Sequence, residues 1–251
     1  FGIGGPLISI GAPKAVFSWF SGDDRATAVG IYTTAPWIGG LFALAATNSL
    51  IMPLTGHSWR LTFVLYSFFA LLCAFIWWLF ARDTSQSENL SKTSIWAVFL
   101  KLIKVRNVKV ILIAGLLTLF IDHGFSNWLP KILENNGFSS NVAGFMASIP
   151  LVVAIPSVLF LPRFVPGHLR GRLLAALAFL TSIVLVIAAT NSSWILITSL
   201  IIYGIAIPTL LPMLMLMIMD EPQVDSGSMG LIGGIFFAAA EIGGFTGPLL
   251  M

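Results

Sequence analysis

Residues 109–137 read KVILIAGLLTLFIDHGFSNWLPKILENNG, and this stretch decides the fold. A helix of about 20 mostly apolar residues spans the roughly 30 Å hydrocarbon core of a bilayer, and this stretch is long enough. It nevertheless carries Asp122 and His123 in its interior. An aspartate at that depth costs on the order of 3 kcal/mol on insertion scales, so it usually faces protein or a water-filled cavity. The stretch therefore predicts a membrane-spanning helix that lines a cavity.

The composition agrees with an integral membrane protein. The chain is 57% hydrophobic and 9% charged, with a mean hydropathy of +0.96, whereas a soluble domain has roughly 25% charged residues. No basic tract indicates nucleic acid as a partner, and the single Cys73 excludes an intrachain disulfide. The three histidines lie in different predicted segments, so we expect no metal site, and no motif calls for a cofactor.

Apolar runs predict eight membrane spans. They are too long for the strands of a transmembrane barrel, which need only about 10 alternating residues, so the prediction is an all-α integral membrane protein. The expected spans are 1–20, 26–51, 61–81, 109–132, 142–162, 172–190, 194–219 and 226–251. The chain opens and closes within apolar runs, so we expect a segment truncated at both ends.

The distribution of basic residues predicts the orientation. Cytoplasmic loops of membrane proteins are enriched in Lys and Arg. Placing the turn at 20–26 in the cytoplasm leaves only Arg60 and Lys131 on the outer side. The inner side then holds Lys14, Arg25, Arg82, Lys92, Lys101, Lys104, Arg106, Lys109, Arg163, Arg170 and Arg172. We expect the cytoplasmic membrane of a prokaryote.

The longest connection, 82–108, predicts the division into domains. Its first part is polar, and its second part, SIWAVFLKLIKVRNVK, favours an amphipathic helix on the anionic inner leaflet. Segments 1–81 and 109–251 then form two helix bundles. An offset of 200 residues aligns Gly30 with Gly230, each shortly after a turn with paired acids. Two related halves of this kind are typical of parallel-repeat transporters.

Five motifs carry a resemblance to a known family. They are PKAVFSWFSGDDRATAVGI (13–31), HSWRLTF (57–63), WLPKILENNGFSSNVAGFMASIP (128–150), RFVPGHLRGRLL (163–174) and AAEIGGFTGPLL (239–250). The chain resembles the major facilitator superfamily over nearly its whole length, and the third motif is similar to its cyanate-permease-like branch. The resemblance implies a two-bundle fold with helices four to six in 1–81 and seven to eleven in 109–251.

Asp122 is the leading candidate for substrate contact or proton coupling. The resemblance places its helix beside the central cavity, where a carboxyl group can bind and release protons. His123 is of a type that titrates near neutrality, but adjacent residues of a helix point about 100° apart, so the two need not share a partner. The alternative for both is a structural pairing with a neighbouring helix. Glu241, amid three glycines that predict tight helix packing, and Lys14 are further candidates.

Other polar residues suit the cavity or the inner face. Asn127 and Tyr203 are candidate cavity-lining groups, and Arg25 with Asp23 and Asp24 is a candidate charge lock between conformations. The run PMLMLMIM (212–219) places Met at every second residue, which spreads the thioethers around a helix. Flexible packing therefore explains this run better than metal binding.

These features together predict a secondary-active transporter of a small solute, working by alternating access as a monomer in the lipid bilayer. The resemblance favours a small organic or inorganic anion as substrate, with protons as a coupling ion. Two alternatives stay open. A receptor-like or structural member of the same fold would show no flux. A membrane-embedded enzyme would need a convergent catalytic set, and the sequence shows none.

Overall fold

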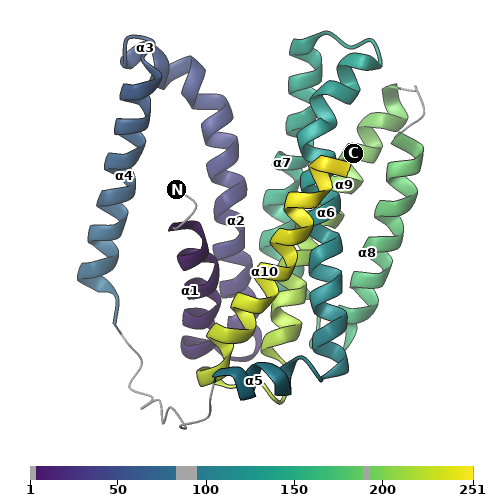
Figure 1. Ribbon diagram of the computed structural model, residues 1–251. Coiled ribbons are helices and arrows are strands. Elements are labelled where there is room, and N and C mark those ends of the chain that lie inside the picture. The colour runs from purple at the N-terminus through teal and green to yellow at the C-terminus, as the bar shows by residue number, and fades with distance from the viewer. Residues whose placement is uncertain (1–3, 83–94, 189–192, 251) are drawn as a thin grey trace. The chain divides into compact units, whose positions relative to one another are not determined.

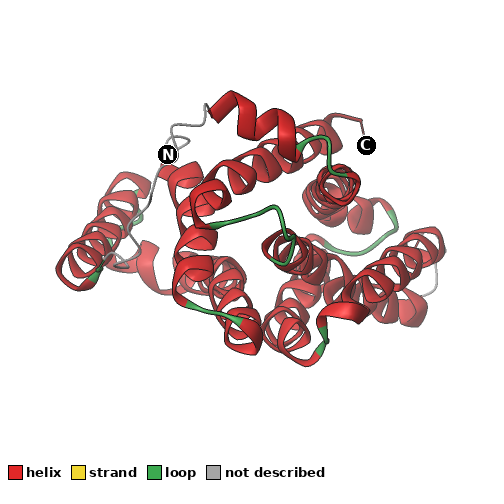
Figure 2. Ribbon diagram, turned by 90° about the horizontal axis from the view of Figure 1, so that it is seen from below, coloured by secondary structure: helices red, strands yellow, loops and turns green. Residues whose placement is uncertain are grey.

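The computed structural model describes residues 4–82, 95–188 and 193–250. Helices and short loops make up this part of the chain (Figures 1 and 2), which confirms the all-α class. The helices are α1 (Gly4–Trp19), α2 (Gly22–Ala46), the π-helical segment η1 (Thr47–Ile51), α3 (Met52–Leu54), α4 (Trp59–Phe80), α5 (Ile95–Leu102), α6 (Arg106–Asn135), α7 (Ser140–Phe164), α8 (Gly167–Ala188), α9 (Ser193–Met219) and α10 (Ser226–Leu250).

Among the residues that the structure describes, five helices, α4, α6, α7, α9 and α10, are long and apolar enough to cross a membrane. The chain is therefore an integral, multi-pass membrane protein. The other expected spans lie in α1, α2 and α8 and stay predictions. α5 falls within the stretch from which we expected an amphipathic helix, while the first part of that connection, 83–94, lies outside the described residues.

The chain separates into two compact units, residues 1–35 with 88–251 and residues 36–87. In the smaller unit, the Thr47 and Tyr66 hydroxyls are 2.7 Å apart, and Ser58 caps α4 by accepting from the Leu61 N–H. In the larger unit α9 is the central helix, because most of its side chains are buried. The division at 82–108 into two bundles stays a prediction.

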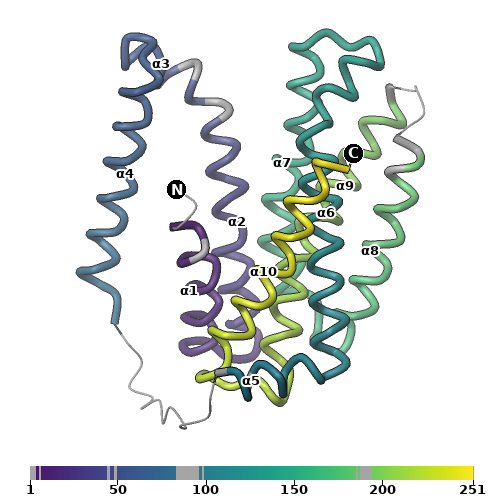
Figure 3. The backbone as a smooth tube through the Cα atoms, viewed as in Figure 1, coloured from purple at the N-terminus to yellow at the C-terminus, as the bar shows by residue number. Residues whose placement is uncertain are grey.

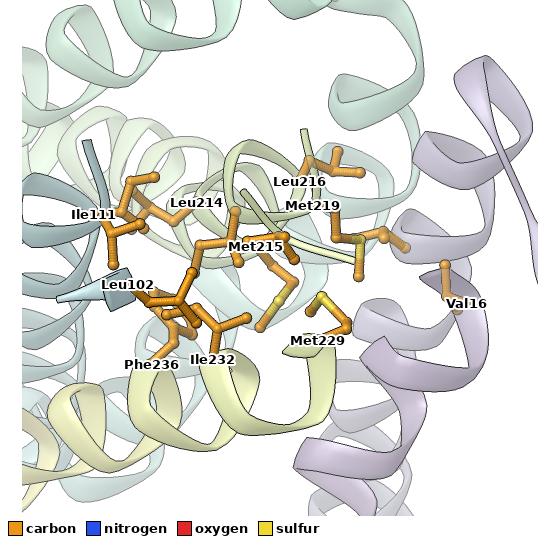
Figure 4. Close-up of a cluster of buried hydrophobic side chains, with 14 of the residues drawn as sticks. Val16, Leu102, Ile111, Leu214, Met215, Leu216, Met219, Met229, Ile232 and Phe236 are labelled. Carbon is orange, nitrogen blue, oxygen red and sulfur yellow. The ribbon is translucent and has the colours of Figure 1, made fainter. Parts of the chain in front are cut away.

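One apolar cluster contains side chains from the N-terminal and the C-terminal helices of the larger unit. Val16 of α1 and Val29 of α2 belong to it, together with side chains from α5, α6, α9 and α10 (Figure 4). Met215, Met219 and Met229 lie inside this cluster and are almost fully buried. The methionine-rich run therefore serves packing, as its spacing predicted.

The tightest helix contact is between α6 and α10, which lie side by side in Figures 1 and 3. A methyl group added at Gly243 would overlap the main-chain carbonyl of Leu116, and one at Gly247 would overlap that of Phe120. These two glycines, four residues apart, let the backbones touch, as in other small-residue helix pairs. The tight packing expected around Glu241 is confirmed.

A reciprocal cap begins α10. The Asp225 carboxylate accepts from the Ser228 N–H at 2.7 Å, and the Asp225 N–H donates to the Ser228 hydroxyl at 2.9 Å. Each residue thus satisfies a main-chain donor that has no partner within the helix. The same hydrogen bonds hold the pKa of Asp225 below its ordinary value.

Replacing Asp225 with alanine is expected to lower the free energy of unfolding by about 1 kcal/mol, the usual worth of an N-cap. Because the folded state favours the carboxylate, the electrostatic part is present above a pH of about 3.9. It disappears as the pH falls through the lower folded-state pKa of Asp225. Thermal unfolding in detergent from pH 7 to 3 measures the loss of stability and its dependence on pH. Asp225→Asn should keep the cap but lose the acid sensitivity. An alanine variant as stable as the wild type contradicts the cap.

Candidate functional site

Asp122 lies at a contact between α6 and α9. The Tyr203 hydroxyl of α9 is 3.1 Å from Asp122 Oδ1, and the Ser126 hydroxyl, one helical turn further along α6, is 3.4 Å from the same oxygen. The two hydroxyls are also 3.3 Å from each other. Tyr203 is fully buried at 1% exposure, and the Phe125 ring packs against its ring at 4.7 Å between centroids.

The partners of Asp122 determine what its carboxyl group can do. Tyrosine and serine hydroxyls both donate and accept hydrogen bonds, so they suit a carboxylate and a carboxylic acid alike. Within the described ranges, no Lys or Arg forms an ion pair with Asp122. The group can therefore change its protonation without breaking a salt bridge.

Pro130 removes one main-chain hydrogen bond of α6 directly after this cluster. Pro130 has no N–H, so the carbonyl of Ser126 loses the donor that would normally pair with it four residues later. The Asn127 side-chain amide donates to the carbonyl of His123 at 2.7 Å, and Ser126 and Asn127 are both exposed. Polar groups therefore continue from Asp122 toward the end of α6 that we predict to be outer.

Five of the predicted site residues fall into three places. Asp122 and Tyr203 meet, with Ser126 as a third member that we did not predict, although its spacing of four residues from Asp122 marks a shared helix face. His123 and Glu241 both lie next to Gly244 of α10. Lys14 of α1 lies against Gly230, near the start of α10, which is about 20 Å along that helix from Gly244 at 1.5 Å per residue.

Arg25 joins the ends of α1 and α9. Its guanidinium donates to the carbonyls of Phe20 at 3.0 Å, Phe17 at 3.3 Å and Met219 at 3.4 Å, and it lies 4.3 Å from the centre of the Phe17 ring. Burial lowers the pKa of Arg25, and the nearby Asp220 carboxylate opposes that shift.

Asp220 is also hydrogen-bonded to Arg170, at the start of α8. Asp23 and Asp24, by contrast, are exposed, and neither pairs with Arg25 in the part of the chain that the structure describes. The acid next to Arg25 is thus Asp220, nearly two hundred residues away in sequence.

Comparison with known protein families matches residues 1–248 to the Major Facilitator Superfamily. An uncharacterised transporter, YycB, of Bacillus subtilis is 30% identical over 60% of this chain and 36% of its own length. The hexuronate transporter of Bacillus subtilis is 22% identical over all of this chain and 63% of its own length. The D-galactonate transporter of Escherichia coli is 22% identical over 95% of this chain and 62% of its own length.

A solved structure has the same fold. The transporter FucP in its outward conformation superposes with a TM-score of 0.79 at 17% identity, covering all of this chain and 66% of FucP. A second structure of FucP is described as that of the fucose:proton symporter of Escherichia coli. The chain thus spans less than two thirds of the length of these relatives.

Proposed function

Because the chain belongs to the Major Facilitator Superfamily, we propose that it is a secondary-active transporter of a small organic anion, driven by protons through Asp122. The observation that carries the proposal is the Asp122 carboxyl group within a helix that is apolar enough to span the membrane, with hydroxyl partners from Tyr203 and Ser126. Such groups within a membrane helix commonly take part in ion or proton pathways.

The substrate class is supported by the relatives. Two of them are named for hexuronate and D-galactonate, which are acids that carry several hydroxyl groups. The fucose:proton symporter supports protons as the coupling ion. The resemblance of residues 128–150 to the cyanate-permease-like branch favours a smaller inorganic anion instead, so both kinds of anion belong in a test. We also propose a monomer in the cytoplasmic membrane of a prokaryote, with bundles 1–81 and 109–251.

Proteoliposomes that hold the full-length protein and a lumenal pH dye test this proposal. We expect a pulse of D-galactonate or a hexuronate to acidify the lumen, and a protonophore to abolish the signal. Uptake of a radiolabelled anion without any pH change would overturn proton coupling. Binding without uptake or exchange would indicate the receptor-like alternative, and neither binding nor flux for any anion would overturn the proposal.

We further propose that Arg25 locks the end of the molecule that we predict to be cytoplasmic. Its three carbonyl partners belong to the last turns of α1 and α9 and to Phe20, which directly follows α1. Cations at helix C-termini satisfy carbonyls that have no partner within the helix and are favoured by the helix dipole. The lock would hold the two bundles together on this side while the other side is open.

Replacing Arg25 with glutamine should therefore open this side more often. In a Cys73→Ser background, a cysteine placed at the buried Val224 reports the opening by its reaction with a water-soluble maleimide. We expect labelling to be several times faster with Arg25→Gln than with Arg172→Gln, which removes an exposed arginine of the same side. Equal rates in the two variants would contradict the lock.

A further inference from the structure

His123 and Glu241 take no part in the hydrogen bonds of the Asp122 cluster that the structure describes. Adjacent residues of a helix point about 100° from each other, so α6 presents Asp122 to α9 and His123 to α10. The hydrogen bonds of Asp122 go to Tyr203 and Ser126, whereas His123 lies next to Gly244. One turn of α6 thus places different polar side chains against two neighbouring helices.

Gly244 brings His123 and Glu241 together. A methyl group added at Gly244 would lie 2.6 Å from Nδ1 of His123 and 3.4 Å from Oε2 of Glu241. Both polar atoms therefore lie close to the same glycine, which has no side chain to separate them. Gly244 is buried, His123 is half-buried and Glu241 is exposed. Among the described residues, neither polar side chain has a hydrogen-bond partner.

We infer that His123 and Glu241 form a second binding site, which holds hydroxyl groups of a polyhydroxylated substrate. The inference rests on the proposed transport function and narrows its substrate class. A carboxylate only accepts hydrogen bonds, whereas a neutral imidazole has one donor and one acceptor nitrogen. A hydroxyl group does both, so it can donate to Glu241 and accept from His123 at once.

Charge fixes which part of the substrate this site binds. The acid group of an anionic substrate would meet the negative charge of Glu241, and like charges in contact disfavour binding. The hydroxylated part therefore faces α10, and the acid group points elsewhere in the cavity. A small inorganic anion without hydroxyl groups gains nothing from this pair. The site thus favours a sugar acid over a cyanate-like ion.

Gly244→Ala tests the site without removing either polar group, because the new methyl displaces the imidazole of His123. The matched control is Gly233→Ala in the same helix, where the added methyl meets only Cε of Met229 at 3.7 Å, an ordinary contact. Binding to the purified full-length protein is measured by titration calorimetry. The probes are D-galactonate, hexanoate as an acid of equal length without hydroxyls, cyanate and neutral D-galactose.

We expect Gly244→Ala to raise the Kd for D-galactonate about tenfold, the usual effect of losing a hydrogen bond to a charged group. Gly233→Ala should leave that Kd unchanged, and hexanoate should bind both variants equally. Glu241→Ala is the second variant and should act like Gly244→Ala, which covers the case in which Gly244→Ala fails to fold. Equal weakening of D-galactonate and hexanoate, or no weakening, would overturn the site.

The probes separate this inference from the transport proposal. If cyanate or hexanoate binds and D-galactonate and D-galactose do not, the anion proposal survives and the hydroxyl site is wrong. If D-galactose binds, loses affinity in Gly244→Ala, and no anion binds, the hydroxyl site survives and the anion proposal is wrong. If the wild-type protein binds none of the four solutes, both are wrong.

Discussion

Replacing Gly243 or Gly247 with alanine is expected to separate α6 from α10 and to leave little folded protein. The new methyl groups would overlap the carbonyls of Leu116 and Phe120, which belong to the main chain of α6. A main-chain carbonyl cannot move aside as a side chain can, so the whole helix must shift. Overpacking a core costs about 1–3 kcal/mol even where side chains adjust, so the loss here should reach or exceed the upper value.

Thermal unfolding and gel filtration in detergent measure this loss. Gly233→Ala serves as control, because its methyl group meets no main-chain atom of another helix. Gly115→Ala should have an intermediate effect, since its methyl would meet the side chain of Phe236, which can turn. A Gly243→Ala variant that elutes and unfolds like the control would show that the two backbones do not touch.

Asp122→Asn is expected to abolish proton-driven uptake while leaving substrate exchange intact. The amide keeps the size of the side chain and can still pair with Tyr203 and Ser126, but it cannot carry a proton through the cycle. In proteoliposomes with an inward proton gradient, accumulation should fall to the level of protein-free liposomes. Exchange of labelled for unlabelled substrate, which needs no net proton movement, should persist.

Two variants sharpen this result. Tyr203→Phe removes one hydroxyl partner but leaves the carboxyl group, so coupling should survive with an altered pH dependence of uptake. Asp24→Asn neutralises an exposed carboxylate outside the cluster and should change neither measurement. If Asp122→Asn still accumulates substrate in response to the gradient, Asp122 is not the coupling residue, and Glu241 is the next candidate.

Hydropathy predicted the helices because a bilayer requires long apolar segments, and α4, α6, α7, α9 and α10 fall where such runs occur. Hydropathy does not indicate which face of each helix meets which neighbour. Asp122 and Tyr203 were each singled out, yet their contact across 81 residues depends on the packing of α6 against α9. The grouping of His123 with Glu241 likewise depends on the close α6–α10 contact.

The partners of Arg25 could not be predicted from the sequence for a different reason. Adjacent Asp23 and Asp24 were its natural partners by charge, but both are exposed and well hydrated, so pairing with them gains little. Carbonyls at the ends of α1 and α9 have no partner within their helices. An arginine that donates to them therefore stabilises the structure more than an ion pair with an exposed carboxylate would. Which helix ends meet at one point is a property of the tertiary structure alone.

The backbone contact between α6 and α10 would affect which lengths of solute the proposed transporter accepts. No change of side-chain rotamer can loosen a contact made by main-chain atoms, so we expect the two helices to move as one rigid body. Asp122 and His123 lie on one of these helices and Glu241 on the other. In the proposed transporter their spacing would then stay constant while the rest of the molecule rearranges, and a solute that contacts both sites would be selected by its length.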